Sequence, residues 1–266
     1  MSRIAIVAAM EREVRPLIRS WKVRILEHGG RRYRLFENKD AALICGGIGA
    51  EAARRATEAV IQEVKPMRVL SVGFAGALDD SLQVGHVLEP STVINAADGV
   101  RTEVGSGGGV LVSSATLADT DQKIRLSKAY GAHAVDMEAA AVAQGAEARG
   151  IDFGALKAIS DAADFCLPAM DRFVAGDGNF DSVRFACHVA LRPWLWGTTI
   201  VLARNSSKAS LALCDALASY LRRPGVGRQT SHDESLVAAL NPTRAASESP
   251  SGHTCAGIEA HTEGKR

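Results

Sequence analysis

Continuous apolar runs alternate with segments of helical periodicity along most of the chain, and this pattern predicts an α/β fold. Ile4–Ala8 and Met67–Val72 read as buried central strands. Three strand-like segments between residues 23 and 45, separated by turns such as Gly29-Gly30, predict an antiparallel meander. We therefore expect a three-layer α/β/α sandwich around a mixed, mostly parallel central sheet.

The stretch from His133 to Asp164 places an acid at the end of each of two apolar runs. One run ends at Glu138 and the other at Asp161, and an alanine-rich helix, Ala139–Arg149, lies between them. Strand, helix and strand of this length predict a parallel crossover unit, with ligands bound at the carboxyl ends of the strands. Both acids are thus candidate ligand-binding residues, although acids are also common at the starts of helices.

Two glycine-rich stretches follow predicted strands. Gly46-Gly47-Ile48-Gly49 leads into a helix over Ala50–Val64, and Gly73–Leu78 is expected to be a second glycine loop. Such glycines let a backbone approach a ligand or simply make a tight turn. The polar segment Asp98–Gly109 is expected to be a flexible connection.

The last helical patterns cover Phe180–Leu191 and Trp194–Leu221 and are broken at Pro224-Gly225. We expect one domain over residues 1–223 and a disordered tail over residues 224–266, which has no apolar periodicity. Trp194 and Trp196 could line an apolar channel, dip toward a membrane, or pack in the core or at a subunit interface.

Composition narrows the function. The 266 residues carry a formal net charge of +1, so no general attraction to nucleic acid is expected. Five cysteines without paired spacing argue against a disulfide framework, and we see no clustered metal ligands. No signal peptide or 18-residue apolar run is evident, so the cytoplasm is the expected compartment.

Six short blocks occur in an order that resembles the purine nucleoside phosphorylase superfamily, and within it the methylthioadenosine/adenosylhomocysteine nucleosidases. The resemblance covers about residues 3 to 220. The blocks are Ala9-Met10-Glu11-x-Glu13-Val14, Gly47-Ile48-Gly49, Gly73-x-Ala75-Gly76, Val112-Ser113-Ser114, Val135-x-Met137-Glu138-Ala139 and Ile159-Ser160-Asp161-x-x-Asp164.

The resemblance implies a role for each matched residue. Asp161 would protonate nitrogen 7 of the departing adenine, and Ser160 would orient that acid. Glu138 would hold the ribose hydroxyls while Met137 packs against the sugar, and Glu13 would position and activate water. Further substrate contacts are expected from Gly49, Phe74, Leu117 and Ala118, the last two near the adenine edge.

The implied chemistry is general acid catalysis without a metal or organic cofactor, typically worth ~10²–10⁴-fold in rate. The acid must still carry a proton near neutral pH, and the apolar neighbours Ala158 and Ile159 favour the uncharged carboxyl. Phosphate would need amide or cationic donors, whereas Glu11 and Glu13 would repel it. Hydrolysis is therefore favoured over phosphorolysis.

Two departures from the family pattern leave the substrate open. Phe74 stands where these nucleosidases usually carry a small hydroxyl residue, and the segment between Ile94 and Val110 is shorter than usual. The pocket should therefore be more open at the 5′ end of the sugar. A compact, hopanoid-linked subgroup has a similar core length, so adenine release from adenosylhopane, by water or phosphate, is an alternative.

A third reading, from another class, is a non-catalytic nucleoside-binding protein. The complete set Glu13, Glu138 and Asp161 argues against it. The expected partner is a small nucleoside, and the resemblance implies a homodimer. Membrane contact is expected only if the substrate is a lipid nucleoside.

Overall fold

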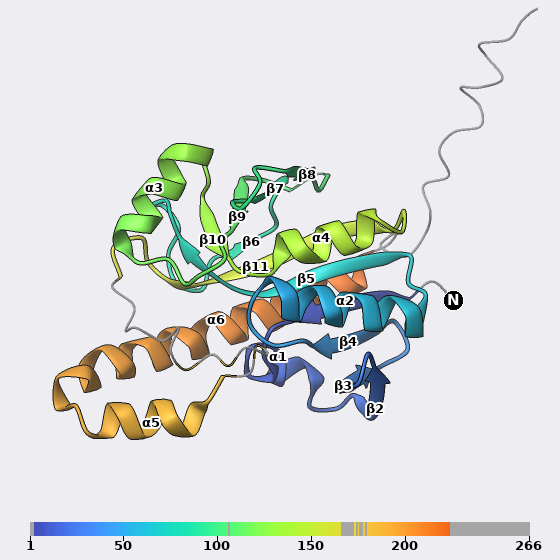
Figure 1. The fold of residues 1–266 in the computed structure, drawn as a ribbon, viewed down its shortest axis with the longest axis horizontal. Coiled ribbons are helices and arrows are strands. Elements are labelled where there is room, and N and C mark those ends of the chain that lie inside the picture. The colour runs from blue at the N-terminus through green and yellow to red at the C-terminus, as the bar shows by residue number, and fades with distance from the viewer. Residues whose placement is uncertain are drawn as a thin grey trace, which may run out of the picture. The chain divides into compact units, whose positions relative to one another are not determined.

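A mixed β-sheet runs through the molecule, and helices pack on both of its faces (Figure 1). The computed structural model describes residues 3–105, 107–165, 173, 175, 178 and 180–223. The strands are β1 (Ile4–Ala8), β2 (Lys22–His28), β3 (Arg31–Glu37), β4 (Ala41–Cys45), β5 (Arg68–Ala77), β6 (Val87–Leu88), β7 (Thr92–Asn95), β8 (Arg101–Glu103), β9 (Val110–Ser113), β10 (Ala134–Asp136) and β11 (Asp152–Asp161). The helices are α1 (Glu11–Ile18), α2 (Ala50–Val64), α3 (Thr120–Tyr130), α4 (Ala139–Glu147), α5 (Ser182–Ala190), the 3₁₀ turn η2 (Pro193–Leu195) and α6 (Trp196–Arg222).

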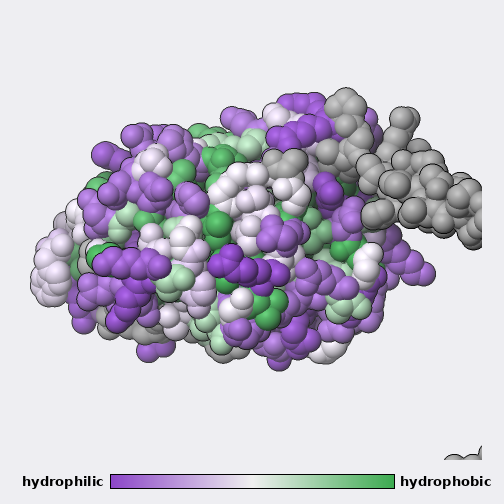
Figure 2. Space-filling view, turned by 90° about the horizontal axis from the view of Figure 1, so that it is seen from above, coloured by the Kyte–Doolittle hydropathy of each residue, from purple (hydrophilic) through white to green (hydrophobic). Residues whose placement is uncertain are grey.

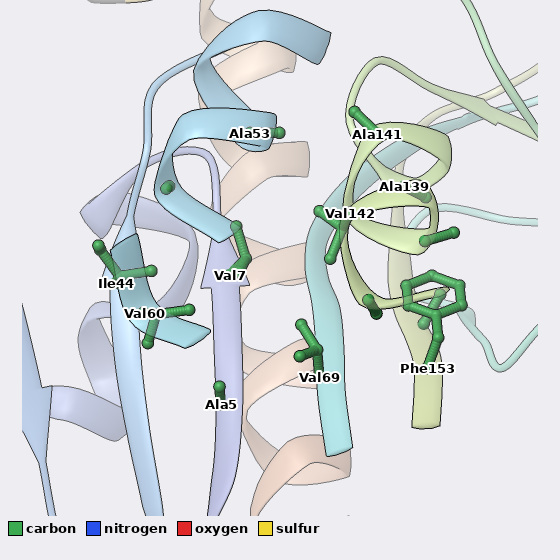
Figure 3. Close-up of a cluster of buried hydrophobic side chains, with 14 of the residues drawn as sticks. Ala5, Val7, Ile44, Ala53, Val60, Val69, Ala139, Ala141, Val142 and Phe153 are labelled. Atoms are coloured by element: carbon green, nitrogen blue, oxygen red, sulfur yellow. The ribbon is translucent and has the colours of Figure 1, made fainter. Parts of the chain in front are cut away.

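The strands are ordered β2-β3-β4-β1-β5-β10-β9-β7-β8, and β11 pairs with both β5 and β6. β1 lies between the parallel strands β4 and β5, while β2, β3 and β4 form the predicted antiparallel meander. Two apolar clusters flank the sheet. One lies under α2 and α4 and includes Val7, Val69 and Val142 (Figure 3), and the other lies under α1 and α6. The predicted α/β/α sandwich is confirmed.

Three local predictions were wrong. β10 pairs antiparallel with β5 while β11 pairs parallel with it, so the segment around α4 is not a parallel crossover. The second glycine stretch is not a loop, because β5 continues through Gly73 and Gly76 to Ala77. The connection expected over Asp98–Gly109 contains β8, which pairs with β7. Gly76 and Ala77 of β5 pair with the distant β10, and β8 pairs with its sequence neighbour β7, so strand pairing stabilises extended backbones that local composition disfavours.

The strand register positions the site. Ala8 pairs with Cys45 on one side and with Val72 on the other, so β1, β4 and β5 reach the same level at their carboxyl ends. β11 runs parallel to β5 with Leu156 opposite Val72, and it continues beyond that level to Asp161. Residues that follow these strands therefore meet at one edge of the sheet, as expected for an α/β ligand site.

The helical hairpin of α5, η2 and α6 extends beyond the sheet at the lower left of Figure 1. Trp194 is 74% exposed and Trp196 is 50% exposed, so neither packs in the core. By contrast, the face drawn in Figure 2 is mainly hydrophilic with scattered apolar spots. Within the described residues, no helix is long and apolar enough to cross a membrane. The expected tail over residues 224–266 lies outside the described residues.

Candidate functional site

A cavity of about 410 Å³ opens at the carboxyl ends of the central strands. Its lining includes eight residues singled out from the sequence: Glu13, Phe74, Leu117, Ala118, Met137, Glu138, Ser160 and Asp161. The ninth, Gly49, donates its backbone N–H to Glu138 Oε1 at 2.8 Å. The fold thus brings the predicted set together from six separate parts of the chain.

Glu13 lies in the first turn of α1, directly after β1, and its side chain is buried. Its Oε2 atom accepts a weak hydrogen bond from the Met10 backbone N–H at 3.4 Å. Burial raises the pKa of Glu13 to about 7, and the charge of Glu138 acts in the same direction while Lys157 opposes it. A carboxyl with this pKa is available as a proton acceptor near neutral pH.

Glu138 follows β10 and begins α4. Its carboxylate is fixed by the Gly49 amide, which a backbone φ of +96° turns toward it. That φ lies in a region that residues with a Cβ atom rarely adopt, which explains the glycine. Burial and the charge of Asp136 raise the pKa of Glu138, while Lys157 opposes the shift.

Lys157 is 1% exposed and lies behind these two acids. Its Nζ atom is 2.8 Å from Asp136 Oδ2, and Asp136 also accepts hydrogen bonds from the Ser113 hydroxyl and the Ala139 N–H. Burial alone would lower the pKa of Lys157, but the charges of Asp136 and Glu138 outweigh burial and raise it. The side chain is therefore a buried ammonium ion whose strongest contact is Asp136.

Asp161 ends β11 beside an irregularity in its pairing with β5. The Ser160 hydroxyl donates to Asp161 Oδ1 at 2.7 Å, as the predicted orienting role requires. Lys123 on α3 donates to Asp161 Oδ2 at 2.5 Å and to the Ala162 carbonyl at 2.6 Å. The side chains of Lys123 and Asp161 are only 2% and 5% exposed. Apolar surroundings were expected for this acid, and the structure instead gives it a buried ion pair.

The glycines of β5 make room for these charged groups. A Cβ atom at Gly73 would lie 3.0 Å from Glu13 Oε2 and 3.8 Å from Lys157 Nζ. At Gly76 it would lie 2.8 Å from Asp161 Oδ2. Because Gly73 and Gly76 are three residues apart on β5, Glu13 and Asp161 approach this strand at different points.

Sequence reasoning missed both lysines and the outer wall of the cavity. The sequence could have indicated the role of Lys157, because a single charge inside an apolar strand must be paired when it is buried. It gave no such indication for Lys123, since a lysine in a polar helix is ordinarily solvated. The wall includes Phe180 and Phe185 and, from α6, Leu202 and Ala203.

The arrangement supports acid–base chemistry on a bound molecule. A proton acceptor, a paired acid and Glu138 line one cavity. The groups that can exchange protons with a molecule bound there are carboxyl, hydroxyl and ammonium groups. Among the residues that the structure describes, no group of three or more His, Cys, Asp or Glu side chains could hold a metal ion.

Comparison with known proteins identifies chains of similar sequence and fold. The chain is 33% identical over 103 residues to a 5′-methylthioadenosine/S-adenosylhomocysteine nucleosidase of Marinomonas sp., a match covering 36% of the chain and 42% of that relative. It is 27% identical over 201 residues to the nucleosidase of the same name from Glaesserella parasuis, covering 61% and 86%. The crystal structure of such a nucleosidase from Colwellia psychrerythraea with adenine has a TM-score of 0.63 at 18% identity, covering 83% of this chain and 94% of that one.

The family model described as "Phosphorylase superfamily" matches residues 3–116 and 106–180. The resemblance seen in the six sequence blocks is confirmed by this match and by the names of the relatives. Since the two matched segments together make up well over half of the sequence, the chain belongs to the phosphorylase superfamily.

Proposed function

We propose that the protein hydrolyses the N-glycosidic bond of 5′-substituted adenosines and releases adenine. The observation that carries this proposal is that Glu13 and Asp161 line one cavity and approach β5 at different points, beside Gly73 and Gly76. This arrangement suits a nucleoside whose anomeric carbon is attacked near Glu13 and whose purine is protonated near Asp161. The relatives named as nucleosidases support the same reaction.

The proposed reaction moves two protons. Glu13 takes a proton from water as the water oxygen bonds to the anomeric carbon of the sugar. The bond from that carbon to the purine breaks, and its electron pair leaves with the base. Asp161 relays a proton from the Lys123 ammonium group, 2.5 Å away, to nitrogen 7 of the purine, so Asp161 ends as a carboxylate and Lys123 as a neutral amine. Exchange with solvent restores the charges of Glu13 and Lys123.

The other residues hold the substrate. Glu138, fixed by the Gly49 amide, would accept hydrogen bonds from the ribose hydroxyls and stabilise positive charge on the sugar in the transition state. Met137 and Phe74 would pack against the sugar, with Leu117 and Ala118 beside the purine. The outer wall includes Phe180, Phe185 and Leu202, which suits an apolar 5′ substituent.

One assay tests the proposal. The protein is incubated with methylthioadenosine, adenosylhomocysteine or an adenosine carrying a long 5′ alkyl chain, with and without phosphate, and free adenine is measured. Release without phosphate supports hydrolysis, and turnover of the long-chain compound alone would favour the adenosylhopane reading. Asp161→Asn serves as the control and should lose orders of magnitude in kcat. Adenosine binding without turnover of any substrate would favour a non-catalytic role.

Phosphorolysis is the second candidate, and one observation favours it. A polar cavity beside the first loop includes Arg32, Arg34 and the glycines Gly46 and Gly47 in its lining, a set that could bind an anion. Against it, Arg34 already donates to both carboxylate oxygens of Glu11 at 2.8 and 2.7 Å. Adenine release that requires phosphate and yields a ribose 1-phosphate product would replace hydrolysis with phosphorolysis.

A further inference from the structure

The tip of the α5–α6 hairpin, residues 191–201, exposes an unusual amount of apolar surface. Leu191 is 77% exposed and Trp194 is 74% exposed, and they are joined by Trp196, Ile200 and Val201 at 50%, 52% and 43%. In Figure 1 this tip is the part of the hairpin farthest from the sheet. Contiguous exposed apolar surface of this kind marks an interaction site rather than ordinary surface.

The charged residues at the tip and directly behind it all have the same sign. No Asp or Glu occurs between Asp181 and Asp215, whereas this segment contains Arg184, Arg192, Arg204 and Lys208. Arg204 and Lys208 lie one and two turns after Ile200 on the same face of α6, roughly 6 and 12 Å along the helix axis. The tip is thus apolar and aromatic, with positive charge directly behind it.

We propose that this tip docks onto the surface of an anionic lipid bilayer. Tryptophan and leucine side chains partition into the boundary between headgroups and acyl chains, and lysine and arginine one or two turns away reach the phosphate level. Docking of a second copy through the same surface would bring together two tips whose charged residues, between Asp181 and Asp215, are all basic. Charge complementarity therefore selects the bilayer as the occupant.

The tip is continuous with the candidate active site. Thr199, Leu202 and Ala203 line the cavity, and they alternate along α6 with the exposed Ile200 and Val201. A bilayer held against the tip would therefore lie beside the apolar wall of the cavity. A nucleoside with an apolar 5′ chain could pass from the membrane to the site along that wall.

Vesicle flotation with the full chain tests the docking. We expect the protein to float with phosphatidylcholine vesicles that contain about one third phosphatidylglycerol, and to bind pure phosphatidylcholine at least tenfold more weakly. Leu191→Ser/Trp194→Ser should weaken binding at least tenfold. Val23→Ser/Ile25→Ser on β2 is the matched control, since those side chains are 47% and 48% exposed, and it should bind like the wild type.

Charge is tested separately. Arg204→Gln/Lys208→Gln should lower the affinity for anionic vesicles by about fivefold per residue. The control Lys22→Gln/Lys39→Gln removes two exposed charges from the β2–β4 region and should leave binding unchanged. Insertion is read from quenching of tryptophan fluorescence by lipids brominated in their acyl chains, with Trp21, which packs against the core, as the reference.

The assay contains no nucleoside, so a failure of docking and a failure of the proposed hydrolysis are separate results. Wild-type protein that stays with neither vesicle type overturns the docking proposal. So does a tip variant that binds as well as the wild type. If the tip substitutions instead convert a dimer to a monomer in sedimentation, the tip is a subunit contact and the proposal falls.

Discussion

Replacing Lys123 with methionine removes one partner of the ion pair that holds Asp161. The structure predicts a large loss of stability, because the two side chains are 2% and 5% exposed and water cannot replace the lost partner. The Ser160 hydroxyl still donates to Asp161 Oδ1, but Oδ2 loses its charged donor. Methionine approximates the length of the lysine stem, so the change removes charge with little change in packing.

The magnitude follows from burial. Removing one member of a buried ion pair leaves an uncompensated charge and costs about 3–5 kcal/mol. For a domain of this size, 1 kcal/mol moves the melting temperature by about 2–4 °C, so each single variant should melt roughly 6–20 °C below the wild type. Asp161→Asn should show a similar loss, since it leaves the Lys123 ammonium buried without its carboxylate.

The double variant distinguishes this account from a simple loss of packing. With both charges removed, Lys123→Met/Asp161→Asn should lie within about 1–2 kcal/mol of the wild type, because replacing a whole buried pair is often nearly neutral. The cycle is measured by urea unfolding at pH 7.5.

Two results would contradict a coupled, buried ion pair between Lys123 and Asp161. If the two single changes were additive in the double variant, the side chains would not be coupled and the pair would contribute nothing beyond packing. A loss below about 1 kcal/mol for Lys123→Met at pH 7.5 would mean that water reaches Asp161. Lys128→Met, on the same helix, is the control for any loss caused by the lysine-to-methionine change itself.

Three further predictions concern the same site. Glu13→Gln should lower kcat by about 10²–10⁴-fold, because the carboxylate form of Glu13 acts as the base. Since the pKa of Glu13 is raised to about 7, wild-type kcat/KM should fall as pH drops below about 7. Because the pKa of Glu13 is raised, the folded state binds more protons than the unfolded state, and the free energy of unfolding of the wild type should decrease by about 3 kcal/mol from pH 4.5 to above 7. The free energy of unfolding of Glu13→Gln should lack this pH dependence. An identical pH dependence in the variant would contradict the raised pKa of Glu13. Gly76→Ala should displace Asp161 and abolish adenine release, because the added Cβ atom would lie 2.8 Å from Asp161 Oδ2. The control Gly108→Ala should leave activity intact, since an added Cβ atom there would have nothing within 4 Å.

Much of the fold could be read from the sequence because the central strands are continuous apolar runs. Ile4–Ala8 and the first half of β5 needed no partner to be recognised. The glycine-containing half of β5 was missed, since its extended conformation depends on pairing with β10 and β11, a tertiary effect that local propensity does not report. β8 was missed although its partner β7 is close in sequence, because its three residues lie in a polar, glycine-rich stretch.

Residues of the candidate site that directly follow a strand could be predicted from the sequence. Residues whose side chains enter the site from other elements could not. Glu138 and Asp161 close apolar runs, so their positions at the edge of the sheet could be inferred. Lys123 lies on a polar helix, and only the folded structure shows its side chain crossing to Asp161. The reason for Gly73 and Gly76 was likewise hidden, because the groups that occupy the space beside them come from other elements.

The distribution of charge in the cavity bears on the choice between water and phosphate. Each buried lysine is in direct contact with one carboxylate, Lys157 with Asp136 and Lys123 with Asp161. Among the residues that the structure describes, no cation is directly paired with Glu13 or Glu138, and burial raises the pKa of both. Negative charge at this position stabilises a sugar that becomes cationic as the glycosidic bond breaks. It also opposes a phosphate dianion at the same place, whereas neutral water carries no such penalty, so the electrostatics that favour bond cleavage also favour hydrolysis.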